Sequence, residues 1–252
     1  MTVVPAYSEH GDGPPLVLLM GLGAPASAWL PHSEHWARSH RCLLLENRGS
    51  GGTPLGAVPA STQDYADDVA SLLESLGTGP VAVAGISMGA CVAQEVALRH
   101  PQLVSRLLLV APWARVDPAT ASTLSVLARA RAGGDDRLLN EMLRNLVWTP
   151  EWVNRHAAEM APGLDLPPTL SPQAFSAQAD ACATHDSLSR LAQIACPTLV
   201  TLGEQDAFIR PELSVEVADA IPGAELRRFA SGHVHHWEEL DEFNRTTEEW
   251  LA

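Results

Sequence analysis

The sequence predicts an α/β fold in which helices cover both faces of a mostly parallel sheet and one helical insertion interrupts the chain. Short apolar runs of strand length alternate with stretches of helical periodicity over residues 1–112 and again over 196–252. Residues 113–195 carry helical patterns without a strand-like run. A chain of 252 residues is long enough for one large domain with a sizeable core. We therefore expect an α/β core formed by 1–112 and 196–252 and a helical lid formed by 113–195.

Each predicted strand is a short apolar run bounded by glycine, proline or polar residues, and each predicted core helix has one apolar face. The helix over 63–76 is a clear example, because Gly77 follows its last apolar residue and is expected to end it. The predicted strands are 3–9, 16–20, 42–47, 80–84, 107–112, 196–202 and 224–229, and the single strand before residue 10 indicates a reduced sheet. The predicted core helices are 29–39, 63–76, 88–99, 211–220 and 238–251. The lid helices are expected near 119–132, 135–147, 150–160 and 172–183, with the alternative that this block is a packing layer with no role in access.

The composition is that of a folded protein with an acidic surface. Hydrophobic residues make up 46% of the chain and the formal net charge is −14, which argues against nucleic acid and anionic membranes as partners. The sixteen basic residues are all arginine, which excludes a lysine Schiff base. The four cysteines lack metal-type spacing and are expected to be free core thiols. With no signal-peptide pattern at residue 1 and no apolar run of membrane-spanning length, we expect a cytoplasmic protein.

A serine between two glycines stands where a predicted strand passes into a predicted helix. The motif is Gly85-Ile-Ser-Met-Gly89, and only small residues allow a strand and a helix to approach so closely around a strained turn. Such a turn lifts the hydroxyl of Ser87 above the sheet, at the positive end of the new helix. The motif alone also fits an ordinary strand-to-helix turn with a bystander serine.

Two further groups follow the ends of later strands, in the order expected for this kind of turn. Asp206 follows the strand over 196–202 and His233 follows the strand over 224–229, so Ser87, Asp206 and His233 are predicted to converge at the carboxyl edge of the sheet. Serine needs a base to remove its proton, histidine can supply that base, and a carboxylate orients the imidazole. His235 is the rival base and Glu204 the rival acid.

The reaction would also need two backbone N–H groups that stabilise an oxyanion. One is expected from Met88, directly after the serine, and the other from Leu22, in the loop that follows the strand over 16–20. Together these five residues predict nucleophilic catalysis on a carbonyl group.

Four motifs in this order resemble those of the α/β-hydrolase superfamily over nearly the whole chain. They are Gly85-Ile-Ser-Met-Gly89, the loop Glu46-Asn-Arg-Gly-Ser-Gly51, the acid loop Gly203-Glu-Gln-Asp206, and Gly232-His233 followed by Glu238. The short chain with a helical block is most similar to the lidded esterase and lactonase branch, including 3-oxoadipate enol-lactonase-like proteins, and Asp186 to Val200 resembles that branch's return from lid to sheet. The resemblance implies an α/β-hydrolase fold, the same catalytic residues and no cofactor. It also implies that Arg48 pairs with an acid.

Several large apolar residues are candidates for the wall of a substrate pocket. Met20 stands where many relatives carry a histidine, which would make that wall more apolar. The other candidates are Trp113, Met142, Trp148, Trp152 and Phe175, with core packing as the alternative for each. The three histidines 233, 235 and 236 lack a fourth ligand at a sensible spacing, so no metal site is predicted.

The sequence thus predicts a serine hydrolase that cleaves a small, largely apolar ester or lactone through an acyl-enzyme. One alternative is a non-hydrolytic reaction with the same triad, such as C–C bond cleavage, cyclisation, acyl transfer or perhydrolysis. Another is a small-molecule receptor on a hydrolase scaffold. The expected partner in all three cases is a small molecule, and the sequence leaves the oligomeric state open.

Overall fold

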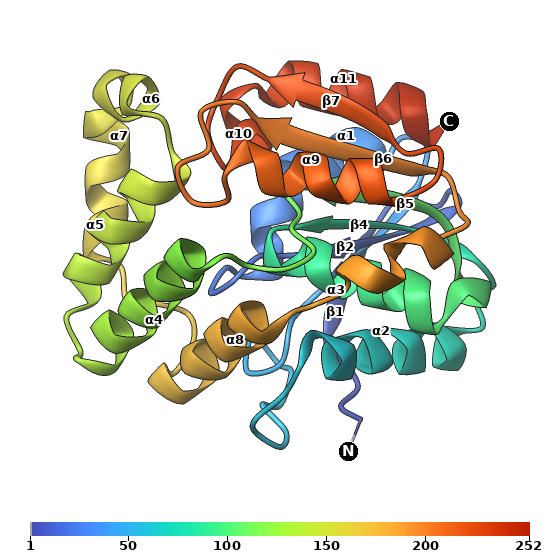
Figure 1. Ribbon diagram of the computed structural model, residues 1–252, viewed down its shortest axis with the longest axis horizontal. Helices are drawn as coiled ribbons and strands as arrows, with labels where there is room; N and C mark the ends of the chain where they lie inside the picture. Colours follow the sequence, from blue (N-terminus) through green and yellow to red (C-terminus); the bar gives the residue numbers. More distant parts are fainter. Residues whose placement is uncertain (1) are drawn as a thin grey trace.

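The computed structural model describes residues 2–252 and contains one sheet of seven strands in the order β1-β3-β2-β4-β5-β6-β7 (Figure 1). Only β1 runs antiparallel to its neighbour; the remaining neighbours pair in parallel. The strands are β1 (Tyr7–His10), β2 (Pro15–Leu19), β3 (Arg41–Leu45), β4 (Val81–Ile86), β5 (Val104–Val110), β6 (Thr198–Gly203) and β7 (Glu225–Phe229). The prediction of a mostly parallel α/β sheet with one N-terminal strand is confirmed.

Helices cover both faces of this sheet because the strands are apolar on both sides. Along β2, Val17 and Leu19 belong to one buried cluster while Leu16 and Leu18 belong to the other, as alternating side chains require. The first cluster is covered by α2 (Thr62–Leu76), α3 (Met88–Arg99) and α9 (Pro211–Ala220), and the second by η1 (Ala26–Trp29), α1 (Leu30–Trp36) and α11 (Leu240–Leu251). The short elements η2 (Pro101–Leu103) and α10 (His235–Glu238) precede β5 and α11.

The chain between β5 and β6 is mainly helical, and most of its helices form a group at one side of the sheet in Figure 1, whereas its last segment packs against α3 and α9. We call residues 113–195 the insertion. Its helices are α4 (Pro118–Ala132), α5 (Asp136–Val147), α6 (Pro150–Arg155), α7 (Ala157–Met160), η3 (Ala161–Asp165), α8 (Pro172–Thr184) and η4 (Leu188–Gln193). Within residues 2–252, the one β-bridge of the insertion is internal to it and joins Arg115 to Asp186.

Several boundaries differ from the prediction, and three of these differences have a local reason. Residues 3–6 do not join β1, because the N–H groups of Val3 and Ala6 donate to the side chains of Asp68 and Thr53 instead of to a strand. The helix expected near 150–160 is broken at His156, whose backbone leaves the helical region. The last helix begins only at Leu240, because the backbone of Glu239, between α10 and α11, is not helical.

The loop after β3 is held by a buried ion pair. Arg48 Nε lies 2.5 Å from Asp68 Oδ2, and both side chains are almost fully enclosed. A buried charge is tolerated only when it is paired in this way. Asp68, on α2, is thus the acid that the resemblance implied for Arg48.

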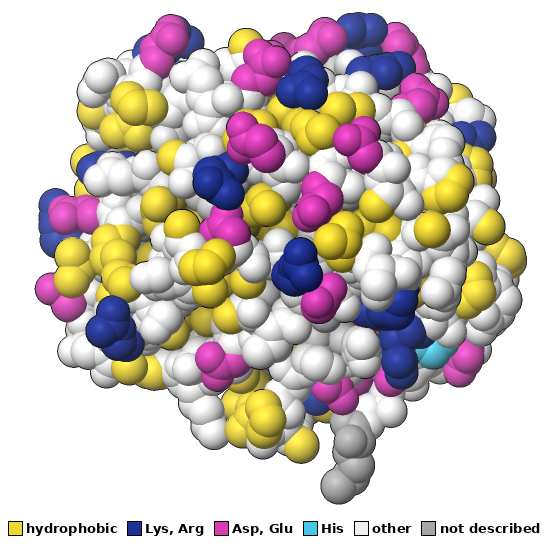
Figure 2. Space-filling model, in the orientation of Figure 1, with side chains coloured by type: hydrophobic (Ala, Val, Ile, Leu, Met, Phe, Trp, Pro, Cys, Tyr) yellow, Lys and Arg dark blue, Asp and Glu magenta, His cyan; other side chains and the backbone are white. Residues whose placement is uncertain are grey.

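On the face shown in Figure 2, arginine and acidic side chains are interspersed and do not form one continuous basic patch. Among residues 2–252, none of the helices combines the length and the apolar character that a membrane span requires.

Three buried histidines make the stability of the fold depend on pH. Burial lowers the pKa of His32 to about 4 and the pKa values of His185 and His235 to about 3. Below about pH 6.5 these histidines therefore bind protons in the unfolded chain but stay neutral in the folded chain. The free energy of unfolding consequently falls as the pH is lowered from about 6.5 toward 4. We expect each histidine to contribute a loss of about 1 to 2 kcal/mol between pH 7.5 and 5.0.

Urea unfolding followed by circular dichroism at the two pH values measures this loss. His185→Gln is the comparison variant, since it removes one titrating group and should reduce the difference between the two pH values. Equal unfolding free energies at pH 7.5 and 5.0 would contradict the expectation.

Candidate active site

Ser87 occupies a strained turn between β4 and α3. Its φ of 55° and ψ of −119° lie outside the regions that L-residues ordinarily adopt. A side chain on Gly85 would place its Cβ 2.2 Å from the carbonyl oxygen of Gly89, and one on Gly89 would lie 2.2 Å from that of Leu19. Both glycines are therefore required by close backbone approach, and the turn exposes the serine hydroxyl at the end of the strand.

Asp206 follows β6, His233 follows β7, and the two side chains form a hydrogen-bonded pair beyond the carboxyl ends of these strands. Asp206 Oδ2 lies 2.7 Å from His233 Nδ1. The other carboxylate oxygen accepts the backbone N–H groups of Phe208 and Ile209, each at 2.8 Å, so the acid is fixed in place. Because an ionised carboxylate only accepts, Nδ1 carries the proton and Nε2 is left as the basic nitrogen.

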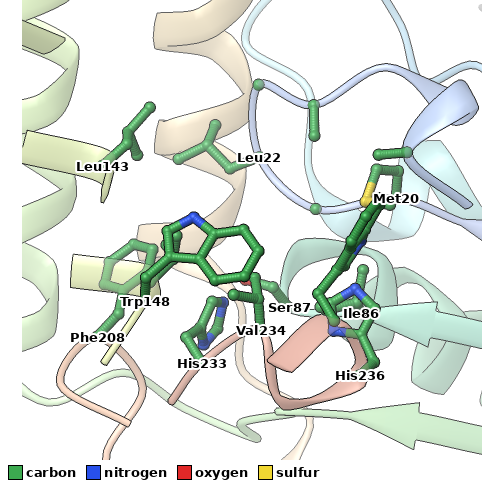
Figure 3. A pocket seen from close by; sticks show the side chains of 16 residues that line it. Met20, Leu22, Ile86, Ser87, Leu143, Trp148, Phe208, His233, Val234 and His236 are labelled. Atoms are coloured by element: carbon green, nitrogen blue, oxygen red, sulfur yellow. The ribbon is translucent and has the colours of Figure 1, made fainter. Parts of the chain in front are cut away.

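Ser87 and His233 line the same cavity, which has a volume of about 350 Å³ (Figure 3). Most of its wall is apolar and comes from the loop after β2, from the end of α5 and from residues near α10. No hydrogen bond joins Ser87 to His233 within residues 2–252. Catalytic hydrogen bonds of an empty site are often long and shorten when substrate binds.

The loop after β2 brings a second pair of predicted residues to this cavity. Leu22 lines it, and Met88 begins α3 directly after the serine. Over the described chain, neither the Leu22 N–H nor the Met88 N–H donates a hydrogen bond to a protein atom. The loop is anchored from the insertion, because Gln178 on α8 accepts the Gly23 N–H at 3.0 Å and donates to the carbonyl of Arg48 at 3.1 Å.

The rival acid and base lie elsewhere. Glu204 is exposed, whereas Asp206 is buried against His233. His235, on α10, is buried, and its Nε2 forms a hydrogen bond of 2.9 Å with the hydroxyl of Thr201 on β6. Neither rival borders the cavity.

Of the six predicted pocket residues, Met20 and Trp148 line the cavity and four do not. The structure places Trp113, Met142, Trp152 and Phe175 outside the wall of this cavity. Trp113 is buried beside His185, and Met142 packs against the main core cluster. Trp152 stacks on the Trp148 ring, with centroids 5.5 Å apart, and borders a different surface hollow. Phe175 packs against the loop from outside, where it would meet a side chain at Gly23.

Other wall residues were missed by the sequence analysis. Leu143 lies in the predicted 135–147 helix, whose leucine and methionine residues recur at helical spacing, and Phe208 follows Asp206 by two positions, so both carried a weak signal. The remaining side chains could be found only from the folded arrangement. They include Ala28, Val147, Val234, His236 and Trp237.

The insertion is also attached to the loop that carries His233. Glu238 accepts the Thr149 N–H at 2.8 Å and the Thr149 hydroxyl at 2.7 Å. The Val234 N–H donates to the carbonyl of Val147 at 3.2 Å. These bonds hold the corner between α5 and α6, and with it the Trp148 indole, over the cavity.

Comparison with known proteins gives a consistent picture of the fold. Residues 14–240 match the family described as "alpha/beta hydrolase fold". The chain is 30% identical to "Putative non-heme bromoperoxidase BpoC" of Mycobacterium tuberculosis over 98% of this chain and 97% of that protein. The crystal structure of BpoC superposes with a TM-score of 0.90 over 99% of this chain and 96% of the other.

Two further relatives carry other descriptions. "Putative carbamate hydrolase RutD" of Azorhizobium caulinodans is 28% identical over 87% of this chain and 84% of its own length. A thermophilic esterase from Thermogutta terrifontis is 26% identical and superposes with a TM-score of 0.88, covering 99% of this chain and 93% of its own. The three descriptions name different reactions, those of a bromoperoxidase, a carbamate hydrolase and an esterase.

Proposed function

The chain belongs to the α/β-hydrolase fold family, and from this we propose that it is a serine hydrolase that cleaves a small, largely apolar carboxylic ester or lactone through an acyl-enzyme. One observation carries the proposal: a serine on a strained turn and a histidine bonded to a buried aspartate border one apolar cavity. The cavity of about 350 Å³ is at the small end of the range for ligand sites, which favours a small substrate.

In the first half of the reaction, Ser87 Oγ attacks the carbonyl carbon while His233 Nε2 takes the hydroxyl proton. Asp206 holds the imidazole and stabilises its positive charge. The oxyanion accepts hydrogen bonds from the Leu22 and Met88 N–H groups. His233 then returns the proton to the leaving alkoxide, and the C–O bond to the alcohol breaks.

In the second half, water replaces the alcohol. His233 removes a proton from the water as its oxygen attacks the acyl carbon, and the bond to Ser87 Oγ breaks as that oxygen regains a proton. The products are the free enzyme and a carboxylic acid; a lactone gives a single hydroxy acid. No cofactor is needed in this scheme.

A second candidate reaction is perhydrolysis, favoured by the likeness to BpoC, which is described as a bromoperoxidase. Hydrogen peroxide would then replace water in the second half and release a peracid. Cleavage of a carbamate, suggested by the description of RutD, would use the same attack on a carbonyl. Product analysis with p-nitrophenyl butyrate, with and without hydrogen peroxide, separates butyric acid from perbutyric acid as the product.

The acyl-enzyme itself is tested by rapid mixing with p-nitrophenyl butyrate and by reaction with a fluorophosphonate. We expect a burst of nitrophenol equal to the enzyme concentration and a covalent adduct that mass spectrometry locates on Ser87. Unmodified Ser87 together with no turnover would overturn the proposal, and a saturable ligand without turnover would instead indicate a receptor.

Asp206→Asn is expected to lower kcat for p-nitrophenyl butyrate by about 10³ to 10⁴-fold with little change in KM, because an amide does not stabilise the imidazolium. Glu204→Gln is the matched control, as it makes the same chemical change two residues away on an exposed side chain. It should stay within about twofold of the wild type. A larger loss of kcat in Glu204→Gln than in Asp206→Asn would show that Glu204, and not Asp206, is the catalytic acid.

A further inference from the structure

His236 is a second histidine in the wall of the cavity that contains Ser87 and His233 (Figure 3). It belongs to α10 and is 1% exposed. The polar side chains of the described wall are those of Ser87, His233 and His236, together with two indole rings. The other lining residues are glycine or apolar. His233 is used by the proposed mechanism, whereas His236 has no part in it.

The ring of His236 sits in an aromatic cluster. Its centroid lies 5.1 Å from that of His32, 5.5 Å from that of Trp29 and 5.9 Å from that of Phe243. Burial, followed by the neighbouring histidines 32, 235 and 233, holds the pKa of His236 well below its ordinary value. The imidazole is therefore neutral, with one N–H donor and one lone pair.

His236 differs from the other buried histidines of this cluster in its hydrogen bonds. His32 Nδ1 bonds Asn244 at 2.7 Å, and His235 Nε2 bonds Thr201 at 2.9 Å. His236 makes no hydrogen bond to residues 2–252, and its Nδ1 is buried without a partner. Because Nδ1 is the enclosed nitrogen, the Nε2 side of the ring is the side that borders the cavity. No protein bond fixes its tautomer, so Nε2 can donate or accept.

The charge of the wall limits what such a histidine can bind. The described lining contains no arginine and no carboxylate. A carboxylate on the substrate would be buried there without a counter-ion, which is costly in an apolar site. An uncharged oxygen can accept from or donate to a neutral imidazole without that cost.

We propose that His236 is a specificity residue, which hydrogen-bonds an uncharged hydroxyl, keto or ether oxygen carried by the substrate. The preferred substrates are then small esters or lactones that bear one neutral polar substituent; plain alkyl and carboxylate-bearing substrates react more slowly. This inference rests on the proposed hydrolase function, and it names the substrate class of the same site.

Three p-nitrophenyl esters of similar size test the inference: butyrate, 3-hydroxybutyrate and hemisuccinate. For the wild type we expect kcat/KM to be roughly tenfold higher for 3-hydroxybutyrate than for butyrate. We expect hemisuccinate to be at least about 100-fold slower than butyrate. His236→Phe keeps an aromatic ring in the cluster and should abolish the tenfold preference, so that kcat/KM for 3-hydroxybutyrate falls relative to that for butyrate.

His236→Gln separates a polar role from a structural one. Glutamine is neutral and can donate or accept, so this variant should keep part of the hydroxyl preference that His236→Phe loses. Circular dichroism and the urea midpoint check that both variants fold. An unchanged preference in His236→Phe, or fast hydrolysis of hemisuccinate by the wild type, overturns the inference even if butyrate is hydrolysed normally.

A binding measurement keeps the inference testable if the enzyme turns over no ester. Ligand-observed NMR titration of Ser87→Ala gives the Kd of methyl 3-hydroxybutyrate and of methyl butyrate without chemistry. The inference predicts tighter binding of the hydroxy ester and loss of that difference when His236→Phe is added. Equal Kd values for the two esters in Ser87→Ala overturn it, whereas absent turnover alone contradicts only the hydrolase function.

Discussion

Ser87→Ala is expected to lower kcat/KM for p-nitrophenyl butyrate by at least about 10⁴-fold, because it removes the atom that forms the acyl-enzyme. The change deletes a single oxygen at a buried position, and the backbone of the turn is set by Gly85 and Gly89. The fold should therefore be kept. Any residual rate would come from the oxyanion donors and from binding alone.

The assay compares steady-state kcat/KM with the burst amplitude for each preparation, so that a contaminating esterase is recognised by its small burst. Ser75→Ala serves as the control, since Ser75 lies on α2 and is not part of the cavity wall. It should match the wild type. A Ser87→Ala variant that retains more than a few per cent of the activity, still with a burst, would show that another group is the nucleophile.

Gly89→Ala is expected to destabilise the protein by about 3 to 5 kcal/mol or to prevent folding. The added Cβ would lie 2.2 Å from the carbonyl oxygen of Leu19 and 2.9 Å from that of Met20, and both are backbone atoms that cannot rotate away. Either the end of β2 or the start of α3 must therefore move. A movement of β2 would also shift the loop that carries Leu22, because this loop follows β2 directly.

Gly163→Ala is the matched control, because nothing lies within 4 Å of the position that its Cβ would take. We expect it to change the unfolding free energy by less than about 1 kcal/mol. Urea unfolding followed by circular dichroism measures both variants. Equal midpoints for Gly89→Ala and the wild type would mean that α3 does not pass β2 as closely as described.

The residues of the predicted mechanism could be located from the sequence because each has a local signal. Ser87 stands between two glycines at a strand-to-helix junction, and Asp206 and His233 each follow a recognisable strand. Parallel strands bring their carboxyl ends to one edge of the sheet, so these signals also imply that the residues meet. The Asp206–His233 bond agrees with that reasoning.

The pocket wall could not be located in the same way. Trp113 and Trp148 are both tryptophans of the insertion, yet one is core and the other covers the cavity. The difference depends on how the α5–α6 corner is tied back to Glu238, a contact between positions 89 residues apart. His236 likewise gained its position from the fold of α10 and from the rings beneath it, and no periodicity or motif marks it.

The insertion is bonded to both loops on which the proposed chemistry depends. Gln178 holds the Leu22 loop, and Thr149 holds the segment that carries His233. Exchanging this block for the corresponding block of a relative would thus alter the reactive centre along with the substrate range. A working chimera would have to carry Thr149 and Gln178, or their equivalents, across with the helices. In protein engineering, residues 113–195 therefore cannot be exchanged without also changing contacts to the catalytic loops.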